Sequence, residues 1–355
     1  MGSSRVIGLD IGATAVRAAE LEFGSGGPAR GDATLVRYGQ VLLPPGAVRD
    51  GEVAEPVTVS AALRQLWQTT KFESRDVVMG VGNQRVLVRE LDLPWLPLPQ
   101  LKASLPFQVG EMLPVSVDDV LLDFYPATES DGPQGRMVHG MLVAAQRATV
   151  NANVLAVEGA GLRPQMVDLN AFALVRALAR GDLASTTAAF VDIGAAVTTV
   201  VVAAQGRPRL VRMLPTGGQA ITAAVAEALS IPPAEAEDVK RRVGFGHPEI
   251  DDPRLVQAAE AVRSVAHPLL EAVRNTFVFY NGKHPGEGVE VVVLTGGASH
   301  LPGAGQFLSS ASRLPVALGD PFGGLRKGKA VRPEHLAGAE QTAALSVGLA
   351  HGVAA

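Results

Sequence analysis

The stretch VIGLDIGATAV at residues 6–16 decides the fold of this chain, because a closely similar stretch returns in the second half. That second stretch is AFVDIGAAVTTV, at residues 189–200. Each consists of an apolar run, then Asp-Ile-Gly-Ala, then a small or hydroxyl residue and another apolar run. This pattern predicts a β-hairpin with a tight glycine turn and an aspartate near the end of its first strand. Two hairpins of one design predict two similar subdomains that face each other across a cleft.

The predicted turns suit a phosphate group. Glycine lets the backbone approach a ligand closely, and the N–H groups of a turn can converge on anionic oxygens. An aspartate beside the turn would repel phosphate but can hold Mg²⁺, usually through water; this is the expected role of Asp10 and Asp192. The alternative is a pair of purely structural turns in which the aspartate bonds its own backbone. The candidate cofactor-binding residues of the hairpins are Asp10, Gly12, Ala13, Thr14, Asp192, Gly194, Ala195 and Thr198.

Two glycine pairs extend the pattern. The stretch VEVVVLTGGAS at residues 289–299 is a buried-strand run that ends in glycines, where a flat ring could lie against bare backbone. The stretch TGGQAIT at residues 216–222 opens a helical pattern over residues 220–229, and helix N-termini attract anions. For this second pair the alternative is a simple helix-start turn. The candidate residues from both pairs are Gly217, Gly218, Gly296, Gly297 and Ala298.

The first Asp-x-Gly hairpin, the second Asp-x-Gly hairpin and the strand that ends in Gly-Gly resemble, in that order, the phosphate-1, phosphate-2 and adenosine motifs of the actin-like ATPases. In detail the chain most resembles the PilM family of type IV pilus assembly. The resemblance runs over most of the chain, and its family-grade segments are PFQVGEMLPV (106–115), DDVLLDF (118–124), MLVAA (141–145), GLRP (161–164), VDLNAFAL (167–174) and AALSVGLA (343–350). It implies an α/β, actin-like (ribonuclease H-like) duplicated fold with an inserted small α+β subdomain, and ATP with Mg²⁺ as cofactors.

The resemblance also divides the chain. The first actin-like half starts with residues 1–84 and ends with residues 146–187, which include a connecting helix. Residues 85–145 form the inserted subdomain, for which the sequence itself predicts a strand–helix–strand–strand pattern. Residues 188–355 form the second half. A polar loop is predicted at residues 129–135, a Gly/Pro-rich turn at residues 23–32 and a basic, Gly-rich loop at residues 323–334.

A further candidate pair lies in the stretch AEAEDVK at residues 234–240. It resembles the helix that contacts ribose and base in actin-like proteins, which assigns those contacts to Glu237 and Lys240. The two residues are three positions apart and share a helix face, so an ordinary solvated ion pair is the alternative.

Hydrolysis is a separate question. In this superfamily a Gln or Glu on the connecting helix orients the attacking water, and the matching position here is Asn170. Asn is shorter and cannot act as a general base near neutral pH. Asp168 is a nearby substitute, although an aspartate at a strand end is more often structural. We therefore expect ATP binding with slow or no turnover, and the catalytic residues stay open.

Composition excludes several classes of function. The 355 residues are 47% hydrophobic and 19% charged, with a net charge of −4 and no basic block, so a nucleic-acid partner is not expected. The absence of cysteine excludes disulfides, thiolate zinc sites and a cysteine nucleophile. Residues 1–5 lead directly into a predicted strand, so no signal peptide is expected. No apolar stretch reaches the ~20 residues that span a bilayer.

Three functions remain open on sequence alone. The first is an ATP-binding scaffold, for which the resemblance implies a cytoplasmic location, peripheral to the inner membrane. It also implies two kinds of partner: the N-terminal cytoplasmic peptide of PilN and other components of the pilus inner-membrane complex. Candidate contacts for that peptide are Leu87, Val88 and residues 93–101, with core packing as the alternative.

The second open function is a sugar or small-molecule kinase of the same fold. The third is an FtsA-like cell-division protein, although the C-terminal residues 342–355 lack the basic polar face of a membrane helix, so direct membrane insertion is not expected. Self-association stays open.

Overall fold

The computed structural model describes residues 4–24, 33–132, 135–245 and 252–352. Its first sheet has the strand order β10-β6-β1-β2-β3-β16. The long strands of this sheet carry the apolar runs on either side of the first Asp-Gly turn. The six strands are β1 (Ser4–Ile11), β2 (Ala15–Phe23), β3 (Ala33–Leu42), β6 (Asp76–Val81), β10 (Arg163–Leu169) and β16 (Arg326–Lys327).

The second sheet has the strand order β13-β12-β11-β14-β15. Its central strands are almost continuously buried, which explains why they read as unbroken apolar runs rather than as an alternation. The five strands are β11 (Thr187–Ile193), β12 (Thr198–Ala204), β13 (Arg207–Leu214), β14 (Val291–Thr295) and β15 (Val316–Leu318).

The two sheets repeat one plan. Read from β3 to β10 in the first sheet and from β13 to β15 in the second, the pairings are antiparallel, antiparallel, parallel and parallel in both. Each Asp-Gly hairpin therefore occupies the same place, with its first strand at the centre of its sheet. This confirms the duplicated α/β fold expected from the repeated motif.

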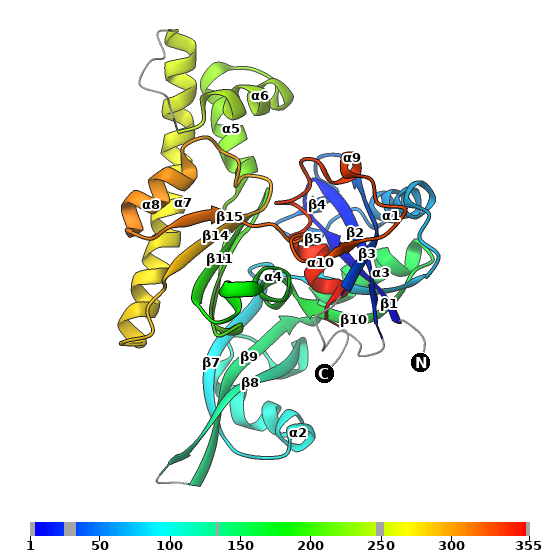
Figure 1. Cartoon of the computed structure of the whole chain (residues 1–355), viewed down its shortest axis with the longest axis vertical. Coiled ribbons are helices and arrows are strands. Elements are labelled where there is room, and N and C mark those ends of the chain that lie inside the picture. Colours follow the sequence, from blue (N-terminus) through cyan, green and yellow to red (C-terminus); the bar gives the residue numbers. More distant parts are fainter. Residues whose placement is uncertain (1–3, 25–32, 133–134, 246–251, 353–355) are drawn as a thin grey trace.

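Helices cover the faces of both sheets. Between the sheets lie α4 (Asn170–Leu178) and α10 (Ala344–Ala350), which share one hydrophobic cluster with both (Figure 1). On the first sheet pack α1 (Pro56–Thr70) and α3 (Arg147–Gly159), with the short strands β4 (Val48–Arg49) and β5 (Glu52–Val53) beside them. The second sheet shares a hydrophobic cluster with four helices: α5 (Gly218–Leu229), α6 (Pro233–Val243), α7 (Pro253–Lys283) and α8 (Ala304–Ser312). The short α9 (Pro333–Leu336) follows β16.

Strand β1 and the helices α10 and α4 approach one another unusually closely, because glycines lie at their contacts. A Cβ added to Gly8 of β1 would lie 2.1 Å from the carbonyl oxygen of Ser346 in α10. A Cβ added to Gly348 of α10 would lie 1.9 Å from the carbonyl oxygen of Ala173 in α4. Neither position can hold a side chain, so backbone packs directly on backbone from β1 through α10 to α4.

The inserted segment folds as expected, into a strand, a helix and two strands. The sheet order is β7-β9-β8, with β7 (Val86–Pro94), β8 (Val120–Gly132) and β9 (Gly135–Gln146), and α2 (Leu98–Val109) covers one face. The predicted loop at residues 129–135 is wrong, because β8 and β9 stay paired as far as Gly132 and Gly135. That part of the ribbon is polar and exposed, so it carries no alternating apolar signal, and Arg136 pairs with Glu129 across it.

Two other predicted loops have different outcomes. Most of the predicted turn at residues 23–32 lies outside the described residues. The predicted loop at residues 323–334 contains β16, which pairs in parallel with β3 and returns the chain to the first sheet. Across the described ranges, no helix combines the length and the apolar character needed to cross a membrane.

Candidate functional site

The two hairpin turns have the same hydrogen-bonded geometry. The N–H of Gly12 donates to the carbonyl of Ala15 at 3.0 Å, and the N–H of Gly194 donates to that of Val197 at 3.1 Å. Among the described residues, the next two N–H groups of each turn donate to no protein acceptor, so they are available to an anion. These groups belong to Ala13, Thr14, Ala195 and Ala196.

The aspartates of the two hairpins interact across the gap between the sheets. Asp10 is 4% exposed, and burial raises the pKa of its carboxyl, opposed by the nearby Arg17 guanidinium. Burial also raises the pKa of Asp192 to about 7, and the charge on Asp10 adds to this effect. The structure therefore brings together two mutually repelling carboxylates, one from each half, an arrangement that a cation relieves.

Arg17 is a site residue that the sequence reasoning missed. It stands opposite Asp10 in the hairpin register, and its Nη1 lies 3.6 Å from Asp10 Oδ2. Its Nε is buried and has no hydrogen-bond partner within the part of the chain that the structure describes. The available signal was a lone cation in an apolar strand, seven residues after the aspartate. The positive charge of Arg17 lowers the pKa of both carboxyls, against the stronger effect of burial.

The glycine pair after β14 forms a third wall beside Asp192. Gly296 has φ of +88°, and a Cβ added there would lie 2.5 Å from the carbonyl oxygen of Ile193 and 2.7 Å from Asp192 Oδ1. The neighbouring Gly297 has no atom within 4 Å of an added Cβ, so its surface is open. The N–H of Ala298 donates to the Ile193 carbonyl at 3.0 Å and fixes this loop against the second hairpin.

The second glycine pair packs against the same turn. The N–H groups of Gly218 and Gln219 donate to the carbonyls of Gly194 and Ala195 at 2.9 and 2.8 Å. A Cβ on Gly217 would lie 2.4 Å from the Gly194 carbonyl oxygen, which explains the glycine. The first N–H groups of α5 therefore hold the second hairpin turn in place. Thr198 does the same from the strand side, because its hydroxyl donates to the Thr216 carbonyl at 2.7 Å.

Glu237 and Lys240 join α6 to α5 at this wall. Lys240 is 6% exposed, and its Nζ donates to Glu237 Oε2 at 2.6 Å, to Thr222 Oγ1 at 3.0 Å and to the Gly218 carbonyl at 3.2 Å. Burial raises the pKa of Glu237, but the hydrogen bonds that its carboxylate accepts from Lys240, Thr222 and Arg241 together lower it to about 2. The pair is therefore not an ordinary solvated one. All three ammonium protons of Lys240 are used within the protein.

The two weak catalytic candidates lie where β10 passes into α4, Asp168 in the strand and Asn170 at the start of the helix. Asn170 lies over the backbone of Gly80 and Gly82, where an added Cβ would meet its side chain at 1.9 and 2.8 Å. Its Oδ1 is buried and has no partner among the described residues. Asp168 is different, because its Oδ1 accepts from the Leu169 N–H and its Oδ2 forms an ion pair with Arg176. Asp168 therefore has a structural role, and it is not free to take a proton from water.

The expected peptide-contact residues divide between core and surface, since Trp95 and Leu98 are exposed while Leu93 and Leu101 are buried. Leu93 and Leu101 are 4% and 1% exposed and belong to the hydrophobic cluster beneath α2. Val88 is partly buried against the large central cluster. Core packing, the alternative reading, therefore accounts for these three residues.

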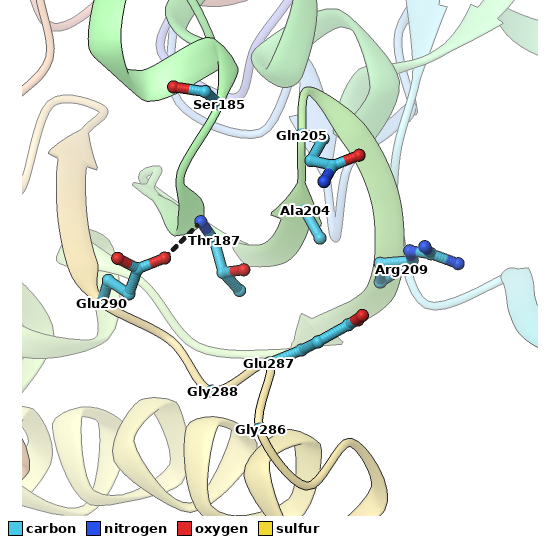
Figure 2. Close-up of a pocket in the computed structure, with 9 residues that line it drawn as sticks. All are labelled: Ser185, Thr187, Ala204, Gln205, Arg209, Gly286, Glu287, Gly288 and Glu290. Carbon is cyan, nitrogen blue, oxygen red and sulfur yellow. Dashed lines mark hydrogen bonds between the residues drawn. The ribbon is translucent and has the colours of Figure 1, made fainter.

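A cavity of about 520 Å³ lies far from the hairpin turns (Figure 2). It is lined by Thr187, Ala204 and Glu290, at the opposite ends of the strands from Ile193 and Thr198, and the Glu290 side chain accepts from the Thr187 N–H at 3.0 Å. Seven-residue strands separate the two ends by about 20 Å. This cavity is therefore distinct from the candidate site at the hairpin turns.

Comparison with known proteins identifies the family. A sequence model of the family described as type IV pilus assembly protein PilM matches residues 8–352. The chain belongs to the PilM family. A solved structure titled PilM-PilN type IV pilus biogenesis complex is 27% identical, covers 97% of both chains and superposes with a TM-score of 0.82. This membership confirms the expected resemblance and favours a role in pilus assembly over the kinase and cell-division alternatives.

More distant relatives share the actin-like fold. The cell division protein FtsA of Pseudomonas aeruginosa is 28% identical over 150 residues, a match that spans 37% of this chain and only 35% of FtsA. MreB 5 of Spiroplasma citri is 11% identical, with coverage of 98% and 95% and a TM-score of 0.55. At this identity the likeness concerns the fold alone. Together with the duplicated sheets, it confirms the expected actin-like architecture.

Proposed function

We propose that this PilM family member binds ATP with Mg²⁺ between its two Asp-Gly hairpins. The observation that carries the proposal is the pair of equivalent turns. Each turn has N–H groups without a protein acceptor among the described residues, and the two aspartates are close enough for the charge of Asp10 to raise the pKa of Asp192. A structure of the related MreB 5 was solved bound to AMPPNP. The assignment of individual residues rests on the geometry described above and on the resemblance to the actin-like motifs.

Each wall of the cleft has a distinct role in this proposal. Phosphate oxygens would accept hydrogen bonds from the turn N–H groups, and Arg17 would supply positive charge beside them. No cluster of three or more metal-ligating side chains occurs among the residues described by the structure, which fits Mg²⁺ held by phosphates and water with Asp10 and Asp192 around it. Bound Mg²⁺ would neutralise the β- and γ-phosphate charge.

The nucleoside would lie against the glycine walls. Gly297 offers open backbone, and Gly218 lies beside Ala298 and Lys240, whose Cβ and Nζ are 3.0 and 3.5 Å from an added Cβ. Since Lys240 is fully engaged, its contribution is to position α5 and α6 rather than to donate to the base. Glu237 Oε2 and Oε1 are likewise paired. This refines the roles expected for the two residues from the family resemblance.

We further propose slow or absent hydrolysis. Asn170 can orient a water molecule but cannot accept its proton near neutral pH, and Asp168 is committed to Arg176. A nucleotide that is bound and not consumed suits a scaffold whose conformation depends on occupancy. The partner in that scaffold would be a PilN-like N-terminal peptide at the cytoplasmic side of the inner membrane, with other inner-membrane pilus components nearby. The division into residues 1–84 with 146–187, 85–145 and 188–355 belongs to the same proposal.

The test is titration calorimetry with Mg-ATP on the wild type and on Asp10→Ala, with phosphate release followed on the same samples. We expect saturable binding by the wild type, at least tenfold weaker binding by the variant, and little phosphate release. Asp182→Ala is the matched control, since it removes an exposed carboxylate of η4 (Gly181–Ala184). Rapid phosphate transfer to a small molecule would favour a kinase, and wild-type protein that binds no nucleotide would refute the proposal. Binding of a synthetic PilN N-terminal peptide, with and without Mg-ATP, tests the partner separately.

A further inference from the structure

A second cavity lies where the insert meets the second sheet, and it plays no part in the proposed nucleotide site. Its volume is about 590 Å³, and its walls come from β7, β8, β9, β13 and the end of α7. We call it the seam pocket. Its charged and titratable side chains are Glu90, Asp92, His139, Arg209, Lys283 and His284.

Most of these charges are already paired. Glu90 lies 3.7 Å from Lys283 Nζ and 3.3 Å from His284 Nε2, which ties β7 to α7. Asp92 Oδ1 lies 2.7 Å from His139 Nδ1. Arg209 differs, because it forms no ion pair and no hydrogen bond within the described ranges, and its Nε is buried. The seam pocket therefore contains one uncompensated guanidinium.

Arg209 also lines the first cavity, so it stands between the two. In Figure 2 its guanidinium points away from Glu290 and Thr187, out of the first cavity. A buried donor without an acceptor loses its hydration without compensation and is a rare feature of folded proteins. The side chain is thus poised to donate to a group that the rest of the chain does not supply.

A second unpartnered group lies close by. Tyr280 is 1% exposed, yet its hydroxyl finds no hydrogen-bond partner in the part of the chain that the structure describes. Burial raises the pKa of Tyr280, and the negative charges of Glu287 and Glu90 raise it further. The positive charge of Arg209 acts in the opposite direction. Its ring stacks on His284 at 4.4 Å between centroids. The phenol therefore lies behind the pocket wall, where it feels the same charged groups but does not line the seam pocket.

We propose that the seam pocket binds a single carboxylate side chain, an aspartate or glutamate of a partner protein, with Arg209 as its anchor. A carboxylate accepts from the guanidinium and neutralises it. A polyanion such as a phosphorylated ligand fits less well, since Glu90, Asp92 and Glu287 would repel its additional charge. The volume accommodates a peptide side chain together with neighbouring backbone.

Because the pocket wall comes from both the insert and the second half, an occupied pocket links the two. The link adds to the Glu90 contacts and to the hydrogen bond from Arg207 Nη1 to the Ala127 carbonyl at 2.7 Å. This inference does not depend on nucleotide binding, because the hairpin turns lie at the other end of the β11 and β12 strands.

The experiment uses the full chain with ¹⁵N-labelled arginine, and it follows the Arg209 Nε–H resonance, identified by its absence in Arg209→Gln. The probe is the capped tripeptide acetyl-Gly-Glu-Gly-amide, with the glutamine peptide, sodium acetate and inorganic phosphate as comparisons. We expect a saturable shift with the glutamate peptide, with a dissociation constant on the order of 1 mM, and none with the glutamine peptide. Acetate should shift the resonance more weakly.

One variant and two controls sharpen the result. In uniformly ¹⁵N-labelled protein, followed through the backbone amides around the pocket, affinity for the glutamate peptide should fall about tenfold or more in Arg209→Gln. Tyr280→Phe, which removes a hydroxyl behind the pocket wall, and Arg212→Gln, at an exposed position of the same strand, should change nothing. No shift, an equal response to the glutamine peptide, tighter binding of phosphate, or full affinity in Arg209→Gln would overturn the proposal. The wild-type comparison of peptides decides even if the variant fails to fold.

Discussion

At the scale of single residues, Arg17 is the side chain whose contribution to the cleft is easiest to isolate. Arg17→Ala removes the cation beside Asp10, so we expect Mg-ATP affinity to fall by about tenfold to a hundredfold, the usual effect of losing a charged hydrogen bond. Arg17→Lys keeps the charge and should recover part of the affinity. Calorimetry on both variants checks this. Equal affinity of wild type and Arg17→Ala would exclude Arg17 from the site.

His351 provides a prediction about pH. It receives a hydrogen bond from Arg180 and packs edge-on against Phe23 at 5.3 Å, and burial together with the charges of Arg180 and Arg176 lowers its pKa to about 3. Between pH 6.5 and 3 the unfolded chain therefore binds a proton that the folded chain does not. Stability from this group is complete above pH 6.5 and is lost as the pH falls, by at most about 1.4 kcal/mol per pH unit.

Urea unfolding at a series of pH values measures this effect. His351→Gln removes the titration and should flatten the dependence of the unfolding free energy between pH 6.5 and 4. His300→Gln, at an exposed position, is the control and should leave the slope as in the wild type. A variant at position 351 with an unchanged slope would show that another group dominates acid sensitivity.

At the scale of elements, the contact between α4 and α10 sets the strictest requirement. Gly348→Ala would push a methyl group into the Ala173 carbonyl at 1.9 Å, and we expect a loss of about 3 kcal/mol or more in unfolding free energy. Gly282→Ala is the matched control, because Gly282 lies in the last turn of α7 with no atom within 4 Å. It should be neutral or stabilising by up to about 1 kcal/mol. Thermal and urea unfolding compare the two, and similar stability of both variants would disprove the close approach.

Elements also show what sequence could and could not predict. The hairpins, the buried strands and the long helices were predictable, since each depends on periodicity and turn residues close together in the chain. The strand pairing at residues 129–132 and 135 was not, because polar exposed strands lack an apolar alternation. The sequence indicated a structural Asp168 as one alternative, but it did not indicate the partners of Lys240 and Asp168. Those partners, Thr222 in α5 and Arg176 in α4, belong to other elements, which no local pattern brings into contact.

At the scale of the whole molecule, the cleft and the seam pocket arise from contacts that no local pattern contains. Asp10 and Asp192 are 182 positions apart in the numbering, and Glu90 and Lys283 are 193 apart. The repeat in the sequence predicted that the hairpins would face each other, because duplication implies symmetry. No repeat or other sequence pattern indicated that the insert would contact the end of α7. For that seam, only the folded arrangement brings the charges together.

The repulsion between the two halves leads to a prediction about overall stability. Asp192→Asn keeps the shape of the side chain but removes one of two repelling charges, so without Mg²⁺ the variant should unfold at a higher temperature than the wild type at pH 8. The same variant should bind Mg-ATP more weakly. Differential scanning fluorimetry with and without Mg-ATP tests both effects, with Asp182→Asn as an exposed control. A lower melting temperature without Mg²⁺ would contradict the repulsion.

The paths by which the chain passes between the two sheets have a mechanical consequence. It leaves the first sheet through α4 and η4, and it returns through residues 319–325, where Phe322 and Leu325 are anchored in the shared cluster before β16 pairs with β3. A further link lies beside the second Asp-Gly turn, where the Gln341 carbonyl accepts from the N–H of Gly296 at 2.7 Å. A ligand that reaches both Asp-Gly turns would therefore join two parts that are already tethered, and it would restrict their relative movement rather than bring them together.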